Sequence, residues 1–171
     1  MQIKTLIKTF IEKKAQLIEV IIEDNNTDYF IDKIEKNINN KLSFATNVKG
    51  EMTDWKLFNE DKNFNNVLNK ALTKNKLEFP PIGLFESWGI KILKQQCTDF
   101  HDHENNKMSG IFYLNDCKTP LEFPEIDIKI YPKKNSFLLF DAFLKHGTST
   151  TSDEVKYAIA CNFQEKKQWE S

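Results

Sequence analysis

Along the first third of the chain, hydrophobic residues recur at helical spacing, and further on they alternate as in β-strands. In residues 3–22 the apolar positions lie three or four residues apart, and lysines and glutamates fill the gaps. This periodicity predicts an amphipathic helix over the segment. Val20, Ile21 and Ile22 are β-branched, so part of the same segment also fits a strand.

Two shorter stretches repeat the helical pattern. Residues 29–38 place apolar side chains on one helical face, after a break in which Asn26 or Thr27 is suited to cap the N-terminus. Residues 61–74 form a second stripe of the same kind. Between them the pattern is irregular, and the run from Asn47 to Gly50 predicts a turn in which Gly50 takes a backbone conformation that other residues rarely adopt.

Pro80 and Pro81 mark the change from helical to strand-like patterning. Apolar or alternating runs follow, separated by polar turns, at residues 85–95, 98–103, 109–114, 121–123, 126–131, 136–140 and 155–163. Short strands at such spacing predict an α+β protein with a sandwich or jelly roll, and helices packed on one sheet. We expect a single domain over residues 1–171, in which 1–79 is a mainly helical cover and 84–165 is the β core.

Composition limits the possible partners. The formal net charge is −1, so no overall field favours nucleic acid or an anionic membrane, and we expect neither as a partner. The chain contains no arginine, so any bound anion must be held by lysine, hydroxyl or backbone N–H groups. Asparagine, lysine and isoleucine are abundant, which suits an A+T-rich bacterial or phage genome.

The cysteines and the N-terminus favour a cytoplasmic protein. Cys97, Cys117 and Cys161 lack the spacing of a disulfide framework or a zinc knuckle, which predicts reduced thiols. Cys97 and Cys161 fall in strand-like runs and are expected to be small core residues. No apolar run is long enough to cross a bilayer, and the first residues lack the pattern of a secretory signal.

The three histidines of the chain form a candidate metal site. His101 and His103 are two positions apart, so on a strand both side chains would face the same side. His146 follows another apolar run, at residues 136–140. Three imidazoles from neighbouring strands are a plausible ligand set for a divalent transition metal. Taken singly, each histidine would be an ordinary polar or packing residue.

The order of motifs from residue 84 to 165 resembles the 2-oxoglutarate and Fe(II)-dependent oxygenases, in particular a bacterial and phage-type subgroup. The motifs are His101-Asp102-His103, then Ser109-Gly110-Ile111-Phe112-Tyr113-Leu114, then the 131–140 run, His146, and the strand from Lys156 to Phe163. The resemblance implies a double-stranded β-helix, the cupin-like jelly roll, that holds Fe(II).

In that family the residue two positions after the first histidine is usually a carboxylate, whereas this chain has His103 there. Three interpretations remain open. The metal is held by His101, His103 and His146, which we favour; Asp99, in phase with His101, supplies the carboxylate; or the chain keeps the fold without iron chemistry. Three imidazoles leave more positive charge on the metal and should still bind Fe(II), Ni(II) or Zn(II).

The resemblance also implies a site for the co-substrate 2-oxoglutarate. The family anchors its distal carboxylate on a basic residue about ten positions after the last histidine, and Lys156 has that spacing from His146. Tyr113 would donate a second hydrogen bond, and Asn162 would lie near the carboxyl group bound to iron. Ala158 replaces a serine found in relatives, so one hydrogen bond, of order 1 kcal/mol, is missing.

The implied activity is a dioxygenase that uses Fe(II), 2-oxoglutarate and O2 and couples decarboxylation to succinate with C–H hydroxylation. The lysine anchor favours prolyl-hydroxylase-like chemistry, but the substrate, a protein side chain or a small molecule, is not readable from the sequence. Two alternatives remain: a non-catalytic metal-binding or interaction module on the same fold, and a three-histidine cupin-type dioxygenase that does not use 2-oxoglutarate.

Overall fold

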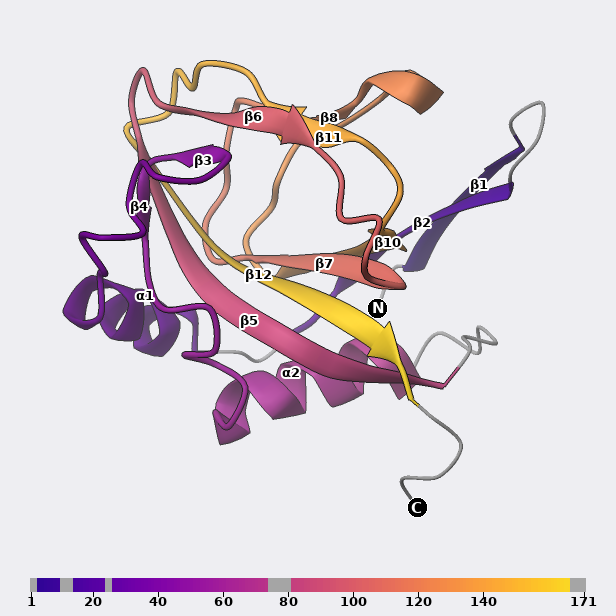
Figure 1. Ribbon diagram of the computed structural model, residues 1–171, viewed down its shortest axis with the longest axis horizontal. Helices are drawn as coiled ribbons and strands as arrows, with labels where there is room; N and C mark the ends of the chain where they lie inside the picture. The colour runs from indigo at the N-terminus through magenta and orange to yellow at the C-terminus, as the bar shows by residue number, and fades with distance from the viewer. Residues whose placement is uncertain (1–2, 10–13, 24–25, 74–80, 167–171) are drawn as a thin grey trace.

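Two antiparallel β-sheets face each other in the computed structural model, which describes residues 3–9, 14–23, 26–73 and 81–166 (Figure 1). The larger sheet has the strand order β1-β2-β10-β7-β12-β5-β4, and the smaller sheet has the order β3-β6-β11-β8-β9. The larger sheet comprises β1 (Ile3–Thr9), β2 (Lys14–Ile21), β4 (Glu51–Met52), β5 (Ile82–Leu93), β7 (Met108–Tyr113), β10 (Ser136–Asp141) and β12 (Val155–Glu165). The smaller sheet comprises β3 (Val48–Lys49), β6 (Cys97–His101), β8 (Leu121–Phe123), β9 (Ile128–Ile130) and β11 (His146–Thr148), and the 3-10 helix η1 (Pro124–Ile126) joins β8 to β9.

The helix predicted over residues 3–22 is wrong, because this segment forms β1 and β2. The two strands pair antiparallel, and β2 also pairs with β10, with Val20 opposite Phe137. Leu17 packs into one hydrophobic cluster while Ile18 and Val20 pack into another. Because β2 buries residues on both faces, its apolar positions do not alternate, and their spacing imitates a helix.

Both later helices are confirmed: α1 spans Thr27–Lys36 and α2 spans Lys62–Thr73. The side chain of Asn26 accepts a hydrogen bond from the backbone N–H of Tyr29 and so caps α1, as predicted. The carboxylate of Asp61 does the same for α2 by accepting from the N–H of Phe64 at 2.9 Å. These caps satisfy backbone donors that would otherwise lack partners in the first turn.

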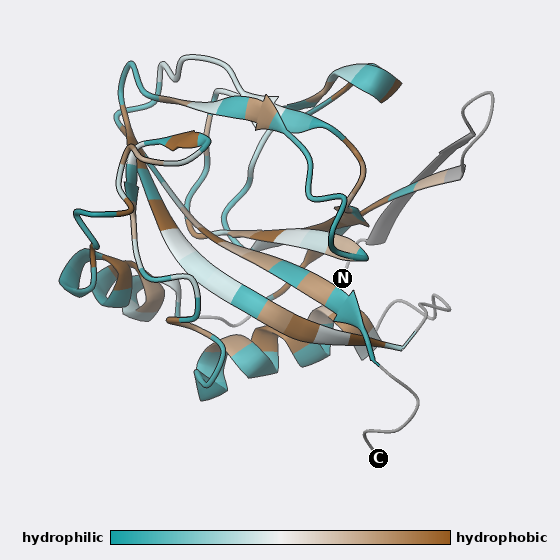
Figure 2. Ribbon diagram, in the orientation of Figure 1, coloured by the Kyte–Doolittle hydropathy of each residue, from teal (hydrophilic) through white to brown (hydrophobic). Residues whose placement is uncertain are grey.

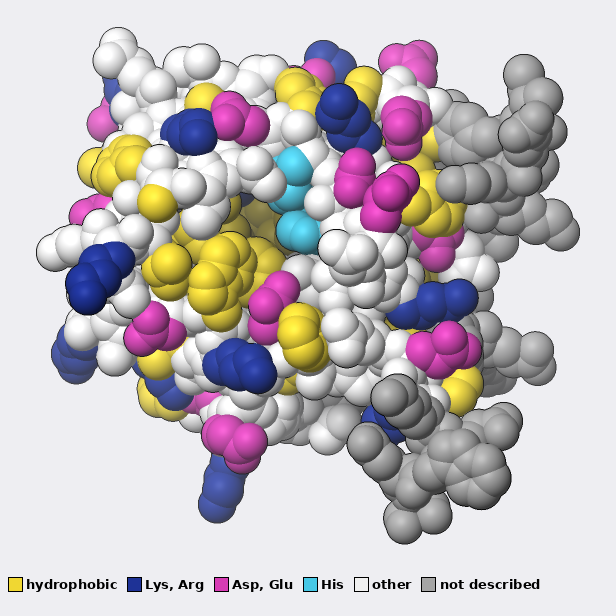
Figure 3. Space-filling model, viewed as in Figure 1, with side chains coloured by type: hydrophobic (Ala, Val, Ile, Leu, Met, Phe, Trp, Pro, Cys, Tyr) yellow, Lys and Arg dark blue, Asp and Glu magenta, His cyan; other side chains and the backbone are white. Residues whose placement is uncertain are grey.

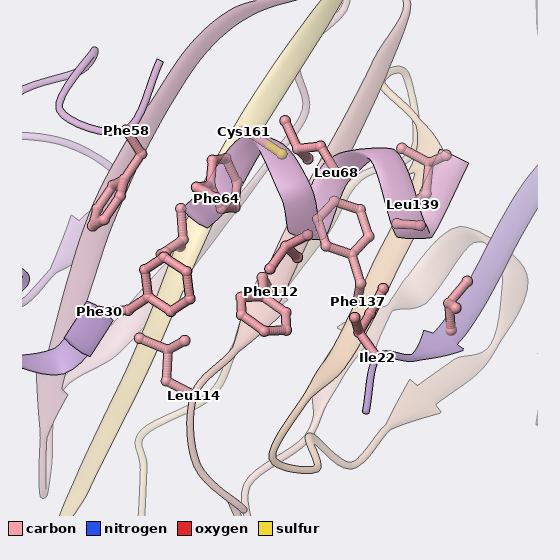
Figure 4. Close-up of a cluster of buried hydrophobic side chains, with 14 of the residues drawn as sticks. Ile22, Phe30, Phe58, Phe64, Leu68, Phe112, Leu114, Phe137, Leu139 and Cys161 are labelled. Atoms are coloured by element: carbon pink, nitrogen blue, oxygen red, sulfur yellow. The ribbon is translucent and has the colours of Figure 1, made fainter. Parts of the chain in front are cut away.

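The helices cover the outer face of the larger sheet, away from the smaller sheet (Figure 1). Their apolar faces turn toward the strands, and the ribbon alternates between hydrophilic and hydrophobic residues accordingly (Figure 2). Phe30 of α1 and Phe64 of α2 meet Phe112 of β7 in a buried cluster (Figure 4). The Phe30 and Phe112 rings lie edge to face with centroids 5.9 Å apart. Each fully buried phenylalanine of this kind contributes about 1.5–3 kcal/mol of transfer free energy.

Gly50 lies where the chain passes from β3 in the smaller sheet to β4 in the larger one. The prediction of a special backbone conformation there is wrong, because no described glycine has a positive φ. Space explains the residue instead: a Cβ at Gly50 would lie 2.7 Å from the carbonyl oxygen of Lys91. Glycine therefore permits close approach of two backbones at this crossing.

The strands predicted beyond residue 81 are confirmed within a few residues, as an α+β jelly roll with helices on one sheet. Strand β11 was not predicted, because His146-Gly147-Thr148 carries no apolar pattern. All three cysteines are free; Cys117 and Cys161 are buried, whereas Cys97, expected in the core, is only partly buried. Among the described residues, no helix is long and apolar enough to cross a membrane.

Candidate functional site

The three histidines meet at one point between the sheets. His101 ends β6 and pairs directly with His146 at the start of β11. His103 lies two residues beyond the end of β6, so the prediction that both histidines are on the strand is wrong for His103. A backbone hydrogen bond from its N–H to the carbonyl of Ala142, 2.8 Å long, fixes the turn that returns the ring to the cluster. The potential ligand atoms of all three rings lie within 4.8 Å of one another.

Backbone carbonyls orient two of the rings. His101 Nδ1 lies 2.7 Å from the carbonyl oxygen of Asp99, and His146 Nδ1 lies 2.9 Å from that of Leu144. A carbonyl only accepts, so in each neutral ring the proton is on Nδ1 and the Nε2 lone pair is free. An imidazole held in this way is prepared to donate Nε2 to a metal ion.

Burial keeps the imidazoles uncharged. Burial, together with the neighbouring imidazoles, lowers the pKa of His103 to about 4 and that of His146 to about 3. The pKa of His101 is lowered by burial as well, although a hydrogen bond to Asp99 and the carboxylates of Asp99 and Asp102 oppose the effect. All three rings are therefore neutral near pH 7, the form that binds metals.

No carboxylate belongs to the group of potential metal ligands among the described residues. The carboxylate of Asp99 forms an ion pair with Lys49 at 3.2 Å, and both side chains are about half exposed. Asp102 is exposed, and its carboxylate accepts a hydrogen bond from the N–H of Glu104. The structure thus brings together His101, His103 and His146 and leaves Asp99 outside the cluster.

A pocket with about 520 Å³ of empty space, part of it open to solvent, extends from the histidines between the two sheets. Alternate residues of β12 line it: Lys156, Ala158, Ala160 and Asn162. The partners of these residues on β5 include Ile92, Ile90 and Trp88, which line it too. In Figure 3, histidine side chains lie at the edge of a hollow with hydrophobic walls, and acidic side chains lie near them. The two alanines leave room that larger residues would fill.

Lys156 is buried at the far end of this lining, with 4% of its surface exposed. Its Nζ donates to the Thr148 hydroxyl at 3.0 Å and lies 5.5 Å from the centroid of the Tyr113 ring. No described carboxylate forms an ion pair with it, and burial lowers its pKa to about 8. An ammonium group without an anion in a buried pocket is costly, which points to an anionic ligand.

Tyr113 is adjacent to this ammonium group. The side chain is fully buried, and its hydroxyl has no hydrogen-bond partner within the described ranges. Burial raises the pKa of Tyr113, so the phenol keeps its proton and can donate a hydrogen bond to a ligand. Sequence reasoning did not assign a site role to Thr148, because the short strand β11 that carries it was not predicted.

Asn162 forms the middle of a polar row. Its Oδ1 accepts a hydrogen bond from the Ser109 hydroxyl at 2.7 Å, and its Nδ2 donates to a Glu86 carboxylate oxygen at 2.8 Å. The three residues are cross-strand partners on β7, β12 and β5. Sequence reasoning singled out Asn162 but missed Glu86, because β5 reads as an ordinary core strand until its register is known.

Scans against models of protein families give no match, and neither does a search of curated proteins. The chain is similar in structure to the viral collagen prolyl hydroxylase of Paramecium bursaria Chlorella virus-1 in complex with 2-oxoglutarate, at a TM-score of 0.68 and 16% identity over 88% of this chain and 96% of that chain. It is also similar to HygX from Streptomyces hygroscopicus with nickel and 2-oxoglutarate bound, at a TM-score of 0.64 and 12% identity over 88% and 83% of the two chains. A third similar structure is a prolyl hydroxylase from Trichoplax adhaerens in complex with a peptide fragment of hypoxia-inducible factor, at a TM-score of 0.62 and 14% identity over 86% and 83%. The chain therefore has the double-stranded β-helix fold that these oxygenases share, as the sequence predicted.

Proposed function

We propose that this protein is a 2-oxoglutarate- and Fe(II)-dependent dioxygenase that hydroxylates a C–H bond and converts 2-oxoglutarate to succinate and CO2. One observation carries the proposal: three neutral imidazoles line the same pocket as a buried ammonium group that has no ion pair with any described carboxylate. Proteins of the same fold have been described with 2-oxoglutarate, nickel or iron bound, which supports this assignment.

The side chains present suit a divalent metal. His101, His103 and His146 would hold it through ring nitrogens, two of them with Nδ1 already bonded to a carbonyl. Three imidazole nitrogens suit Fe(II), Ni(II) and Zn(II). When bound, the metal and 2-oxoglutarate supply the oxidising chemistry with O2, and the protein supplies ligation, orientation and exclusion of water.

The opposite end of the lining suits a carboxylate. Lys156 would bind the distal carboxylate of 2-oxoglutarate, helped by the Thr148 hydroxyl that already accepts from its ammonium group. Tyr113 has an unused hydroxyl donor nearby. Ala158 provides space but no hydrogen bond, so we expect the affinity to depend strongly on Lys156. Asn162, held by Ser109, would lie beside the carboxylate at the metal end.

The direct test is an anaerobic titration of the protein with Fe(II) and then with 2-oxoglutarate. We expect a weak visible charge-transfer band that appears only when both are present, and 2-oxoglutarate binding detectable by calorimetry. Succinate formation in air then measures turnover. Absence of the band and of succinate with every substrate tried would refute the proposal.

The all-histidine cluster also favours a second candidate, a three-histidine dioxygenase that does not use 2-oxoglutarate. No carboxylate joins the cluster in the described part of the chain. The two candidates differ at Lys156, which the first requires for turnover and the second does not. A non-catalytic metal-binding module on the same fold would show no affinity for 2-oxoglutarate at all.

A further inference from the structure

The polar row formed by Ser109, Asn162 and Glu86 lies at the opposite end of β12 from Lys156. Along this face of the strand, Lys156 is followed by Ala158 and Ala160 and then by Asn162. Phe140, which packs against His146 with ring centroids 4.7 Å apart, pairs with Ser109 on the neighbouring strand. The histidine cluster is therefore next to the polar row, and the co-substrate site proposed at Lys156 is on the other side of the alanines.

Glu86 is held in place but keeps hydrogen-bonding capacity. Its cross-strand partner is Asn162, so both side chains leave the sheet on the pocket face, in the same series as Trp88 and Ile90. One carboxylate oxygen accepts from Asn162, and no described lysine forms an ion pair with Glu86. The side chain is partly buried, so this carboxylate on the pocket face of β5 is only partly exposed to solvent.

Two further observations at the same place point to a ligand. Trp88 lies two residues after Glu86 on the same face of β5. Its indole Nε1 is buried and has no hydrogen-bond partner in the described segments. On the histidine side, the carboxylate of Asp102 is exposed and forms no ion pair with a described lysine. Lys107, the residue just before β7, is exposed and interacts electrostatically with Asp141.

We propose that Glu86, positioned by Asn162 and Ser109, binds a cationic group of the substrate, an ammonium group on an aliphatic stem. The inference rests on the proposed function and names the substrate class for that site. The walls of the pocket that holds the histidines include Trp88 and Val48, which suit methylene groups. Two strand spacings, about 10 Å, separate Ser109 from Glu86, so several carbons of the stem would reach from the carboxylate toward the histidines.

The test measures binding before turnover. With Zn(II) in place of iron, 2-oxoglutarate is titrated first, and capped pentapeptides with a central lysine, norleucine or glutamate follow in the same sample. We expect the lysine peptide to bind about 10- to 100-fold more tightly than the norleucine peptide, the range for a hydrogen bond to a charged group. Free lysine and 1,5-diaminopentane, added in parallel, distinguish a peptide source from a small molecule.

Glu86→Gln removes the charge but keeps an oxygen that accepts from Asn162. In this variant the preference for lysine over norleucine should fall to within about threefold, while the affinity for the norleucine peptide is not lowered. With Fe(II) and O2, the same variant should raise KM for the cationic substrate more than it lowers kcat. Glu60→Gln, an exposed carboxylate just before α2 on the helix-covered side, is the matched control and should retain the preference.

The outcomes are separable. Failure to bind 2-oxoglutarate would refute the proposed function. Normal 2-oxoglutarate binding with equal affinity for the lysine and norleucine peptides would overturn only the role of Glu86. A preference for lysine that survives in Glu86→Gln would also overturn it, because another group would then supply the charge.

Discussion

The two faces of strand β12 have different tasks. One face, with Ile159, Cys161 and Phe163, packs against the helices in a cluster of fully buried side chains. The other face runs from Lys156 through Ala158 and Ala160 to Asn162, and it borders empty space. Because side chains alternate along a strand, one segment contributes both to a buried hydrophobic cluster and to the wall of the pocket.

The difference between the two faces predicts which property, stability or ligand affinity, a substitution should change. Large apolar residues on the helix-covered face gain stability from close packing, and their truncation leaves a cavity. On the pocket face, small and polar residues contribute little packing, and Lys156 carries the cost of a buried charge. We therefore expect substitutions on the first face to lower the free energy of unfolding, and substitutions on the second face to change ligand affinity.

The largest expected effect is on the helix-covered face. Ile159 is completely buried, and Ile159→Ala should lower the free energy of unfolding by about 2–5 kcal/mol through lost transfer free energy and a cavity. Urea denaturation followed by circular dichroism measures this change. Affinity for 2-oxoglutarate, measured at a temperature at which the variant is folded, should remain within about threefold of the unsubstituted protein. A large loss of 2-oxoglutarate affinity in the folded variant would show that the two faces of β12 do not act independently.

The next effect concerns the metal end of the pocket. His103→Ala removes one of three ligands and should weaken Zn(II) binding by more than about 100-fold, since even an outer partner of a metal ligand contributes 10- to 100-fold. A chelator competition assay measures the affinity. Asp99→Asn is the contrasting variant, because its carboxylate is engaged with Lys49 outside the cluster.

Asp99→Asn should leave the affinity for Zn(II) within about threefold, as expected for an exposed ion pair. The reverse result, with Asp99 essential and His103 dispensable, would support the alternative from the sequence in which the Asp99 carboxylate binds the metal. It would require the segment between residues 99 and 103 to rearrange when metal binds.

At the other end of the pocket, Lys156→Met replaces the ammonium group with an apolar side chain of similar length. We expect 2-oxoglutarate affinity to fall about 10- to 100-fold, because one charge-assisted contact is lost. The free energy of unfolding should not fall, because burial of the unpaired charge no longer opposes folding. Calorimetric titration and urea denaturation of the same sample give both values.

Lys94→Met is the matched control, since Lys94 is exposed and paired with Glu154 on the surface. It should leave 2-oxoglutarate affinity unchanged. If Lys156→Met also left the affinity unchanged, the three-histidine alternative without 2-oxoglutarate would be favoured.

The sequence predicted the pocket face better than the N-terminal part of the fold, for a physical reason. Strand alternation placed Lys156 and Asn162 on one face, and the spacing of the few histidines indicated the cluster. By contrast, residues 14–21 form strand β2 because they pair with β10, which lies more than 100 positions further along the chain. The apolar spacing of residues 3–22 does not reveal this pairing. Glu86 and Thr148 become recognisable only when cross-strand register is known, because neither belongs to a local motif.

The smallest expected effect is a pH dependence that belongs to the pocket face alone. Burial lowers the pKa of Lys156 to about 8 from its ordinary value of 10.5. The amine is protonated below that pKa, so 2-oxoglutarate should bind most tightly below pH 8 and lose about tenfold in affinity per unit above it. The lowered pKa has the opposite consequence for the ligand-free protein, whose stability should rise between about pH 8 and 10.5, because the unfolded chain then binds more protons at this residue. Lys156→Met should show neither trend, so the ratio of the two affinities across pH isolates the amine from any titration at the metal. A ratio that stays constant between pH 7 and 9.5 would mean that the ammonium group does not contact the co-substrate.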